Sequence, residues 1–283
     1  MKADSPSRTA LGAAMHRAAH QLLDQPPIFE DPYALRIIGS EAEAELRGGT
    51  GAHSDPRRRG LRAFIAARSR FSEDALGEAI ARGVRQYVLL GAGLDTFAYR
   101  AARNYPGLAV FEVDHPATQA WKRERLADSR LTIPDSLTFA PVDFESETLA
   151  TGLARAGFDS SKPAIFAWLG VVPYLTHEAI TATLRFVASL PAGTEVIFDY
   201  GEPPPARAEA SQSGIKAMME RVAEAGEPFR SFFHAEELVP EVKALGFSDV
   251  EDWDSPKLNA RYFTGRDDDL KLLGYGHLLR ARV

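Results

Sequence analysis

The segment Tyr87-Val88-Leu89-Leu90-Gly91-Ala92-Gly93-Leu94-Asp95-Thr96 decides the fold of this chain. Its apolar run ends at a glycine, which is typical of a buried parallel strand that turns into a helix. Glycine at such a turn lets the backbone approach a ligand closely, and the start of a helix offers free amide groups. The segment therefore predicts the first strand of a sheet with a binding turn at its carboxyl end.

Further strands are predicted downstream of this segment, and helical stretches separate most of them. The strands are short apolar runs over residues 109–114, 137–142, 164–169 and 195–200. Strands that alternate with helices at this spacing predict an α/β fold with a mostly parallel sheet and helices on both faces. Such sheets bind their ligands at the carboxyl ends of the strands, so we expect the site there.

The two ends of the chain follow other patterns. Residues 1–82 have helical periodicity, with helices predicted over 9–23, from Asp31-Pro32 onward and over 61–82, and a loop over 48–60. A further helical stretch, 206–226, interrupts the alternation, and we expect it to form a lid over the site. The last part of the chain predicts two strands, over 247–253 and 275–283.

Composition excludes several classes of function. A net charge of −6 makes the chain too acidic for a protein that binds nucleic-acid phosphates. The absence of cysteine excludes disulfides, thiolate metal sites and cysteine nucleophiles. The longest apolar stretch, 164–175, falls short of the ~20 residues that span a bilayer, and the first ten residues lack a secretory signal. We therefore expect a cytoplasmic protein without membrane or nucleic-acid partners.

Acidic residues on the second predicted strand indicate an adenosine-containing cofactor. Glu112 and Asp114 lie about 20 residues beyond the glycines, where a carboxylate can accept hydrogen bonds from both ribose hydroxyls. A nicotinamide dinucleotide would need a third glycine where this chain has Thr96, and Asp95 would repel its pyrophosphate. S-adenosylmethionine has no phosphate and carries an ammonium group, so the pattern favours this cofactor.

Another pair of residues, Asp143 and Phe144, follows the third predicted strand. An aspartate beside an aromatic ring can bind the adenine amino group and cover the face of the base. The alternative is that Asp143 caps the next helix.

Two other kinds of catalytic site lack support. His16 and His20 lie four positions apart on a predicted helix, but the glutamate of a zinc-protease signature is missing. The strained Gly-x-Ser-x-Gly turn of a serine hydrolase is also absent from the sequence. We expect no metal.

Several segments of the sequence together resemble the leucine carboxyl methyltransferase-type family of S-adenosylmethionine-dependent O-methyltransferases, in its bacterial small-molecule branch. The similar segments are 66–71, 90–100, 111–116 with Lys122, 141–144, 156–159 and 168–176. The resemblance is clear over residues 9–200 and looser at 246–247 and 276–279. It implies a class I methyltransferase, Rossmann-like sheet in one domain, with a helical N-terminal cap (1–82), a cofactor-binding core (83–200), a helical lid insertion (201–235) and C-terminal strands that complete the sheet (236–283).

The resemblance also implies roles for individual residues in binding S-adenosylmethionine. Gly91 and Gly93, with Asp95 beside them, would pass under the methionine portion of the cofactor. The family pattern gives the ribose to Asp114, the adenine to Asp143 and Phe144, the cofactor carboxylate to Arg68 and, more loosely, a second basic role to Arg17. Leu169 departs from the family pattern, because several members carry a glutamate at this position. The cofactor contact made by that glutamate must be absent or replaced in this chain.

Methyl transfer from a sulfonium is an in-line displacement whose driving force resides in the cofactor, so the protein chiefly positions donor and acceptor. A carboxylate acceptor needs no base, whereas an alcohol or phenol does. The sequence does not name that base; the candidates near predicted strand ends are Tyr174, Tyr200, His115 and Asp199.

The acceptor is expected to be a small molecule held against an apolar wall, for which the sequence offers Phe229, Phe232 and Phe233. Two alternatives stay open: a cofactor-binding protein without catalytic activity, and an NAD(P)-dependent oxidoreductase, which shares the fold class and the acidic second strand.

Overall fold

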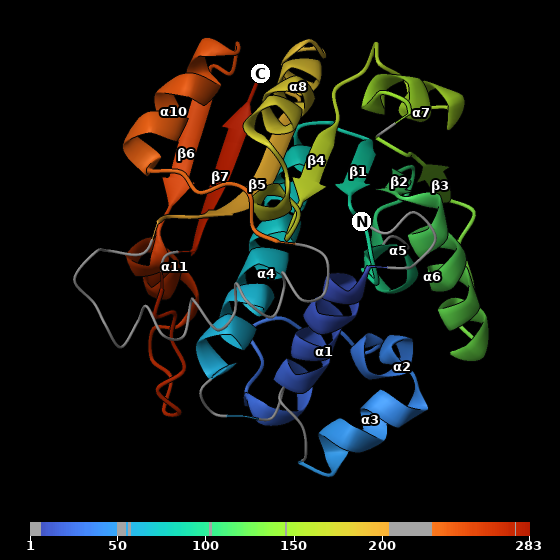
Figure 1. The fold of residues 1–283 in the computed structure, drawn as a ribbon, viewed down its shortest axis with the longest axis vertical. Coiled ribbons are helices and arrows are strands. Elements are labelled where there is room, and N and C mark those ends of the chain that lie inside the picture. Colours follow the sequence, from blue (N-terminus) through green and yellow to red (C-terminus); the bar gives the residue numbers. More distant parts are fainter. Residues whose placement is uncertain are drawn as a thin grey trace.

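The computed structural model describes residues 7–49, 55, 58–101, 104–144, 146–203, 228–274 and 276–283. Its centre is a seven-stranded sheet with the order β3-β2-β1-β4-β5-β7-β6 (Figure 1). The first five strands run parallel, and β7 runs antiparallel to its neighbours β5 and β6. The strands are β1 (Gln86–Leu90), β2 (Ala109–Asp114), β3 (Leu137–Pro141), β4 (Ile165–Trp168), β5 (Glu195–Gly201), β6 (Asp249–Trp253) and β7 (Gly276–Arg282).

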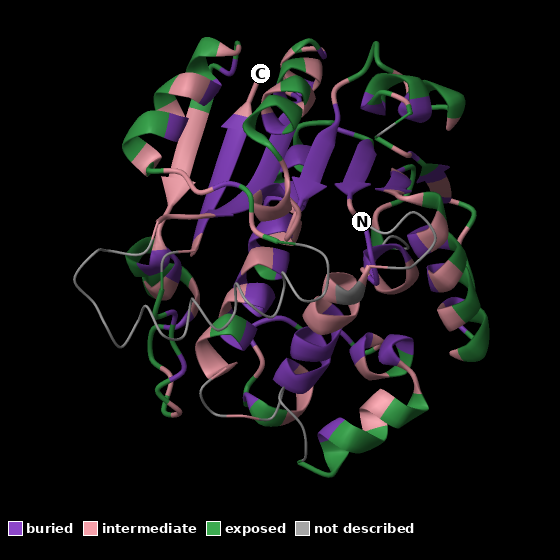
Figure 2. Ribbon diagram, in the orientation of Figure 1, coloured by how far each residue is buried: buried purple, intermediate pink, exposed green. Residues whose placement is uncertain are grey.

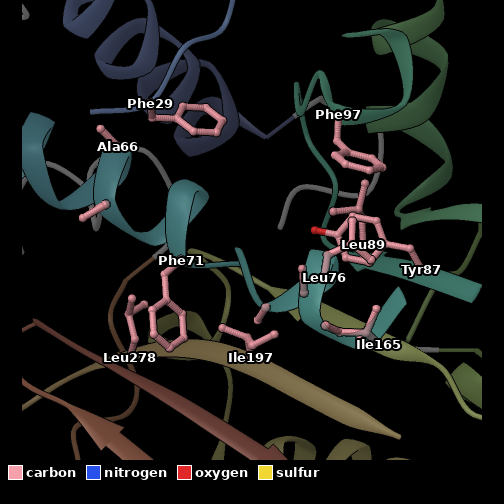
Figure 3. Close-up of a cluster of buried hydrophobic side chains, with 14 of the residues drawn as sticks. Phe29, Ala66, Phe71, Leu76, Tyr87, Leu89, Phe97, Ile165, Ile197 and Leu278 are labelled. Atoms are coloured by element: carbon pink, nitrogen blue, oxygen red, sulfur yellow. The ribbon is translucent and has the colours of Figure 1, made fainter. Parts of the chain in front are cut away.

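Helices cover both faces of the sheet, as the sequence predicts. One face packs against α4 (Arg59–Ala81), α5 (Phe97–Arg100) and α11 (Ser255–Tyr262), and the other against α7 (Leu149–Arg155), α8 (His177–Ala188) and α10 (Ala235–Ala244). Along β1, Tyr87 and Leu89 join the first cluster, which Figure 3 shows, while Val88 and Leu90 join the second. Both faces of the central strands are therefore buried (Figure 2), which explains their continuous apolar sequences.

The N-terminal helices lie beyond the carboxyl ends of β1 and β4 (Figure 1). They are α1 (Arg8–Leu23), α2 (Ala34–Ile38) and α3 (Ser40–Arg47). Helix α1 packs against α2 and α4, and buried residues of α1 and α2 share an apolar cluster with Leu126 of α6 (Pro116–Asp128). This position brings α1 and α4 over the strand ends where we expect the site.

Some local predictions were wrong. Helix α2 begins at Ala34 rather than at Pro32, because the carboxylate of Asp31 accepts the N–H of Tyr33 and forms a turn first. The sequence pattern did not reveal α3, which buries a single residue, Leu46, among polar neighbours. It also missed α10, which contains Pro240, a residue that usually ends a helix.

Parts of the N-terminal loop, residues 50–54 and 56–57, and the predicted lid helix, 206–226, lie outside the described residues. None of the helices in the described part of the chain combines the length and hydropathy needed to cross a bilayer. Within the same residues, no three histidines or carboxylates are grouped so that they could hold a metal ion.

Candidate functional site

A cavity of about 1380 Å³ opens at the carboxyl ends of β1, β4 and β5. The strand β1 lies between β2 and β4, so the chain reverses its direction of travel across the sheet at this point. Ligands of α/β sheets bind at such switch points. Pockets for single small ligands measure about 300–1,000 Å³, so this cavity has room for a cofactor and a small acceptor together.

Two glycines shape the turn after β1 on the floor of the cavity. Gly91 and Gly93 have φ angles of 65° and 47°, in the left-handed region that favours glycine. A Cβ atom at Gly91 would lie 2.4 Å from Cγ2 of Val171, and one at Gly93 would lie 3.0 Å from Cβ of Ala10. The turn therefore lies in close contact with the loop that follows β4 on one side and with helix α1 on the other.

The helix predicted after this turn is present but short. Helix α5 has only 4 residues, so it provides little of the helix dipole that a longer helix would bring to the turn. Oδ1 of Asp95 accepts the N–H of Phe97 at 2.7 Å. One amide at the helix start is thus used within the protein, and Asp95 lines the cavity while it holds the turn.

Asp114, at the end of β2, joins the glycine turn to the cavity. Its Oδ2 accepts the N–H of Gly93 at 2.6 Å, and its Oδ1 accepts the N–H of His115 at 2.7 Å. Burial raises the pKa of Asp114, and the two backbone hydrogen bonds oppose that change. A carboxylate oxygen can accept more than one hydrogen bond, so Asp114 keeps acceptor capacity toward a ligand in the cavity.

Glu112, the other acidic residue of β2, has a different role. Its fully buried carboxylate lies 2.6 Å from Nζ of Lys122 on α6, and the hydroxyl of Tyr99 donates to it at 3.3 Å. Glu112 is fully buried beside α6 and, unlike Asp114, does not line the cavity. Lys122, which belongs to the family-like blocks of the sequence, is therefore the partner of Glu112.

Arg68 of α4 pairs with Asp199 of β5. Nη1 of Arg68 donates to Oδ2 of Asp199 at 2.9 Å, and the two side chains are 12% and 6% exposed. Asp199 also accepts the N–H of Gly170, and a Cβ at Gly170 would lie 2.6 Å from Nη2 of Arg68. Both charged side chains line the cavity. Together they present a cation and an anion, which matches the carboxylate and ammonium of an amino acid.

Leu169 precedes Gly170 and lines the cavity, with its side chain packed against the apolar cluster on the α4 face. An apolar surface thus replaces the glutamate of related sequences. The sequence suggested Asp199 only as a candidate base; its pairing with Arg68 could not be predicted, because the two residues are 131 positions apart.

Arg17, predicted as a second basic group for the cofactor, lines the cavity and is also anchored within the protein. Its Nε donates to Oδ2 of Asp31 at 2.8 Å, and its Nη2 donates to the carbonyl oxygen of Leu94 at 2.5 Å. The hydroxyl of Thr96 donates to the same carboxylate oxygen of Asp31 at 2.6 Å. Arg17 and Asp31 therefore hold helix α1 against the glycine turn.

The Asp143-Phe144 pair lies at another part of the cavity wall. Phe144 is 58% exposed, and both residues line the cavity. The N-cap of α7 is Thr148, whose hydroxyl accepts the N–H of Thr151 at 3.2 Å. The alternative that Asp143 caps the next helix is therefore wrong.

Two of the candidate bases are engaged in hydrogen bonds with the protein. Nδ1 of His115 accepts the N–H of Ala117 and caps α6. The hydroxyl of Tyr200 donates to Oδ1 of Asp252 at 2.7 Å, and burial together with this hydrogen bond raises the pKa of Tyr200. The hydroxyl of Tyr200 thus stays protonated at neutral pH while it donates to Asp252.

Another part of the cavity wall is apolar and aromatic. Tyr174, in the short helix η4 (Val172–Tyr174), lies 5.2 Å from Phe229 between ring centroids, and Phe229 lies 6.1 Å from Phe232. Phe64 of α4 adds another ring. Phe233, by contrast, packs into the apolar cluster on the opposite face of the sheet. The predicted aromatic wall thus contains Phe229 and Phe232 but not Phe233.

Comparison with known proteins gives consistent results. A family model described as leucine carboxyl methyltransferase matches residues 10–188. YktD of Bacillus subtilis, provisionally named an S-adenosyl-L-methionine-dependent methyltransferase, is 31% identical over 99% of both chains. A protein of Frankia alni with the same kind of name is 37% identical over 65% of this chain and 64% of its own.

Two solved structures share the fold at low sequence identity. A provisionally named methyltransferase from Thermobifida fusca gives a TM-score of 0.57 at 17% identity and covers 99% of this chain and 96% of its own. A DUF574 family protein from Streptomyces avermitilis gives a TM-score of 0.54 at 18% identity, with 96% of each chain covered.

Proposed function

This chain belongs to the leucine carboxyl methyltransferase family of S-adenosylmethionine-dependent methyltransferases, and from this premise we propose that it methylates an oxygen atom of a small-molecule acceptor. One observation carries the proposal. A single cavity extends from the glycine turn and Asp114 to an aromatic wall that includes Phe64 and Phe229. Donor and acceptor can therefore occupy adjoining compartments of the same cavity.

The donor compartment has the chemistry that S-adenosylmethionine requires. In our assignment, Asp114 accepts hydrogen bonds from the ribose hydroxyls, and Arg68 with Asp199 receives the charged amino-acid end. We assign the adenine to Asp143 and Phe144, on the basis of their place in the wall. When bound there, the cofactor supplies a methyl group on a positively charged sulfur.

The residues of this chain act mainly by positioning. Gly91 and Gly93 let the backbone lie close to the donor, beside Asp95, and Leu169 adds an apolar contact. Effective in-line transfer requires reacting atoms about 3–3.5 Å apart. The aromatic residues Phe64, Tyr174, Phe229 and Phe232 favour an apolar or aromatic acceptor and exclude water from it. The helices of residues 1–82 close this compartment from the α1 and α4 side.

Methyl transfer to oxygen is tested directly with S-adenosylmethionine labelled in its methyl group and apolar acceptors that carry a hydroxyl, a carboxyl or an amino group. We expect O-methyl ethers or esters, identified by mass spectrometry. Methylation of amines alone would contradict the proposal. Tight binding of S-adenosylhomocysteine without any transfer would favour a non-catalytic binding protein, and binding of reduced nicotinamide cofactor would favour an oxidoreductase.

The Gly170→Ala substitution tests the role of Arg68. The added Cβ would displace the Arg68 guanidinium, which lies 2.6 Å away, so we expect S-adenosylhomocysteine to bind about tenfold or more weakly in calorimetry. Gly157→Ala is the matched control: its φ is 84°, close to the 74° of Gly170, but no atom lies within 4 Å of the new Cβ. Equal effects of the two substitutions would show that backbone strain alone explains the loss.

A further inference from the structure

A group of titratable side chains connects the three strands at one edge of the sheet. The hydroxyl of Tyr200, on β5, donates to Oδ1 of Asp252, on β6. Nδ1 of His277, on β7, lies 3.0 Å from the same Oδ1 and 3.3 Å from the Tyr200 hydroxyl. Tyr200 and His277 are direct partners in the β5–β7 ladder. The imidazole is therefore held in place, with Nδ1 directed to Asp252.

Glu202 joins this group to the cavity. It follows β5, lines the cavity, and has a side chain that is 29% exposed. Its Oε1 lies 3.7 Å from Nε2 of His277, whose side chain is 10% exposed. The order from the cavity toward the edge strand β6 is therefore Glu202, His277 and Asp252.

This row lies at the acceptor end of the cavity. A Cβ added to Gly201, which precedes Glu202, would lie 3.7 Å from the ring of Phe232. A Cβ added to Gly276, the register partner of Gly201, would lie 2.8 Å from the ring of Phe64. Both rings belong to the aromatic wall, and Glu202 lines the same cavity as these rings.

The electrostatics of the row raise the proton affinity of His277. Burial lowers the pKa of His277, but the hydrogen bond and charge of Asp252, with the negative charge of Glu202, raise it above its ordinary value of 6.5 overall. Lys257 of α11 donates to the carbonyl oxygen of Asp252 at 2.7 Å. The charged or titratable groups placed around the imidazole are Tyr200, Glu202, Asp252, Asp254 and Lys257.

We propose that the acceptor carries a hydroxyl group and that Glu202 receives its proton and passes it to His277. This inference rests on the proposed transfer to oxygen. As the acceptor oxygen bonds to the methyl carbon, the carbon–sulfur bond breaks and its electron pair stays on sulfur, which becomes a neutral sulfide. The hydroxyl proton moves to Glu202 and then, as the carboxylate closes the 3.7 Å gap to hydrogen-bonding distance, to Nε2 of the neutral His277 imidazole. Asp252 is a positioning residue, which fixes the imidazole through Nδ1 and stabilises its positive charge.

The same geometry disfavours a carboxylate acceptor. Such an acceptor is already anionic at neutral pH and needs no base. It would also meet the negative charge of Glu202 in a partly buried compartment, where like charges repel more strongly than in water.

Nuclear magnetic resonance tests the row without any acceptor. We expect the His277 ring to titrate above 6.5 in the wild-type protein, and its pKa to fall in both Asp252→Asn and Glu202→Gln. The matched control is Glu251→Gln, because Glu251 neighbours Asp252 on β6 but its carboxylate accepts the indole N–H of Trp253. An unchanged His277 pKa in Glu202→Gln would overturn the inference.

The acceptor class is tested with 2-naphthol and 2-naphthoate, two probes of similar shape, titrated into protein saturated with S-adenosylhomocysteine. We expect 2-naphthol to bind about tenfold or more tightly than 2-naphthoate, and Glu202→Gln to improve binding of the carboxylate. With 2-naphthol as substrate, the acid limb of the rate profile should move to lower pH in Asp252→Asn, which a purely structural role would not cause.

Other outcomes separate this inference from the proposed function. Equal or tighter binding of 2-naphthoate, or no binding of 2-naphthol, would overturn the hydroxyl acceptor. Formation of a methyl ester from 2-naphthoate alone would also overturn it while supporting transfer to oxygen. Methylation of nitrogen alone in the wider acceptor panel would overturn transfer to oxygen itself.

Discussion

Substitution of Asp24 by alanine is expected to lower the free energy of unfolding by about 3–5 kcal/mol, because it removes a fully buried carboxylate that accepts two hydrogen bonds from a buried guanidinium. Asp24 follows α1 and is fully buried. Its carboxylate accepts hydrogen bonds from Nε and Nη2 of Arg62 at 2.6 and 2.9 Å, and lies 2.9 Å from Nδ1 of His20. These contacts join α1 to α4, the two helices that cover the cavity.

Denaturation with urea, followed by circular dichroism, measures this effect. The matched control is Glu43→Ala, which removes the exposed pair of Glu43 with Arg47 on α3 and should cost about 1 kcal/mol or less. Similar losses in the two variants would contradict the assigned role of Asp24.

The Asp24 carboxylate also makes the free energy of unfolding depend on pH. Burial acts to raise the pKa of Asp24, but the hydrogen bonds and charges of Arg62 and His20 outweigh it and lower the pKa from 3.8 to about 2. A lowered pKa stabilises the folded state above pH 3.8, and this contribution is lost as the pH falls through about 2. Asp24→Asn should therefore flatten the decline in stability over this interval.

Substitution of Asp114 by alanine is expected to weaken binding of S-adenosylhomocysteine by about 100-fold or more. Each hydrogen bond to a charged group contributes about 1.5–3 kcal/mol, and the proposed contacts to the ribose would lose two of them. The turn would also lose the carboxylate that accepts the N–H of Gly93. The affinity of Asp114→Asn for S-adenosylhomocysteine should lie between those of the wild type and Asp114→Ala, because the asparagine amide retains one oxygen acceptor.

Calorimetric titration compares these variants with the wild type. The control is Asp128→Ala, which removes an exposed carboxylate at the far end of α6. Comparable dissociation constants for wild type and Asp114→Ala would contradict the ribose assignment, and a large effect of Asp128→Ala would indicate a nonspecific loss of negative charge.

The central strands and the glycine turn could be predicted because their signals are local. Strands buried on both faces have continuous apolar sequences, and a turn with φ angles of 65° and 47° requires Gly91 and Gly93. Elements that break local rules escaped prediction: α10 contains Pro240, and α3 exposes most of its surface.

The arrangement of the acceptor end could not be predicted because it depends on strand order. Tyr200 and His277 are 77 positions apart, and they meet only because β7 inserts between β5 and β6. The pairing of Arg68 with Asp199 could not be predicted either, because the two residues are 131 positions apart in the sequence. The sequence pattern placed the end of this strand within one residue of Gly201, where β5 ends, and named Tyr200 as one candidate base among several.

The most direct measurement is a crystal structure of the protein soaked with S-adenosylhomocysteine. The account predicts the ribose hydroxyls within hydrogen-bonding distance of Asp114, and the amino-acid end beside Arg68 and Asp199. Density for the ligand at another place, with the turn at Gly91 and Gly93 empty, would contradict it.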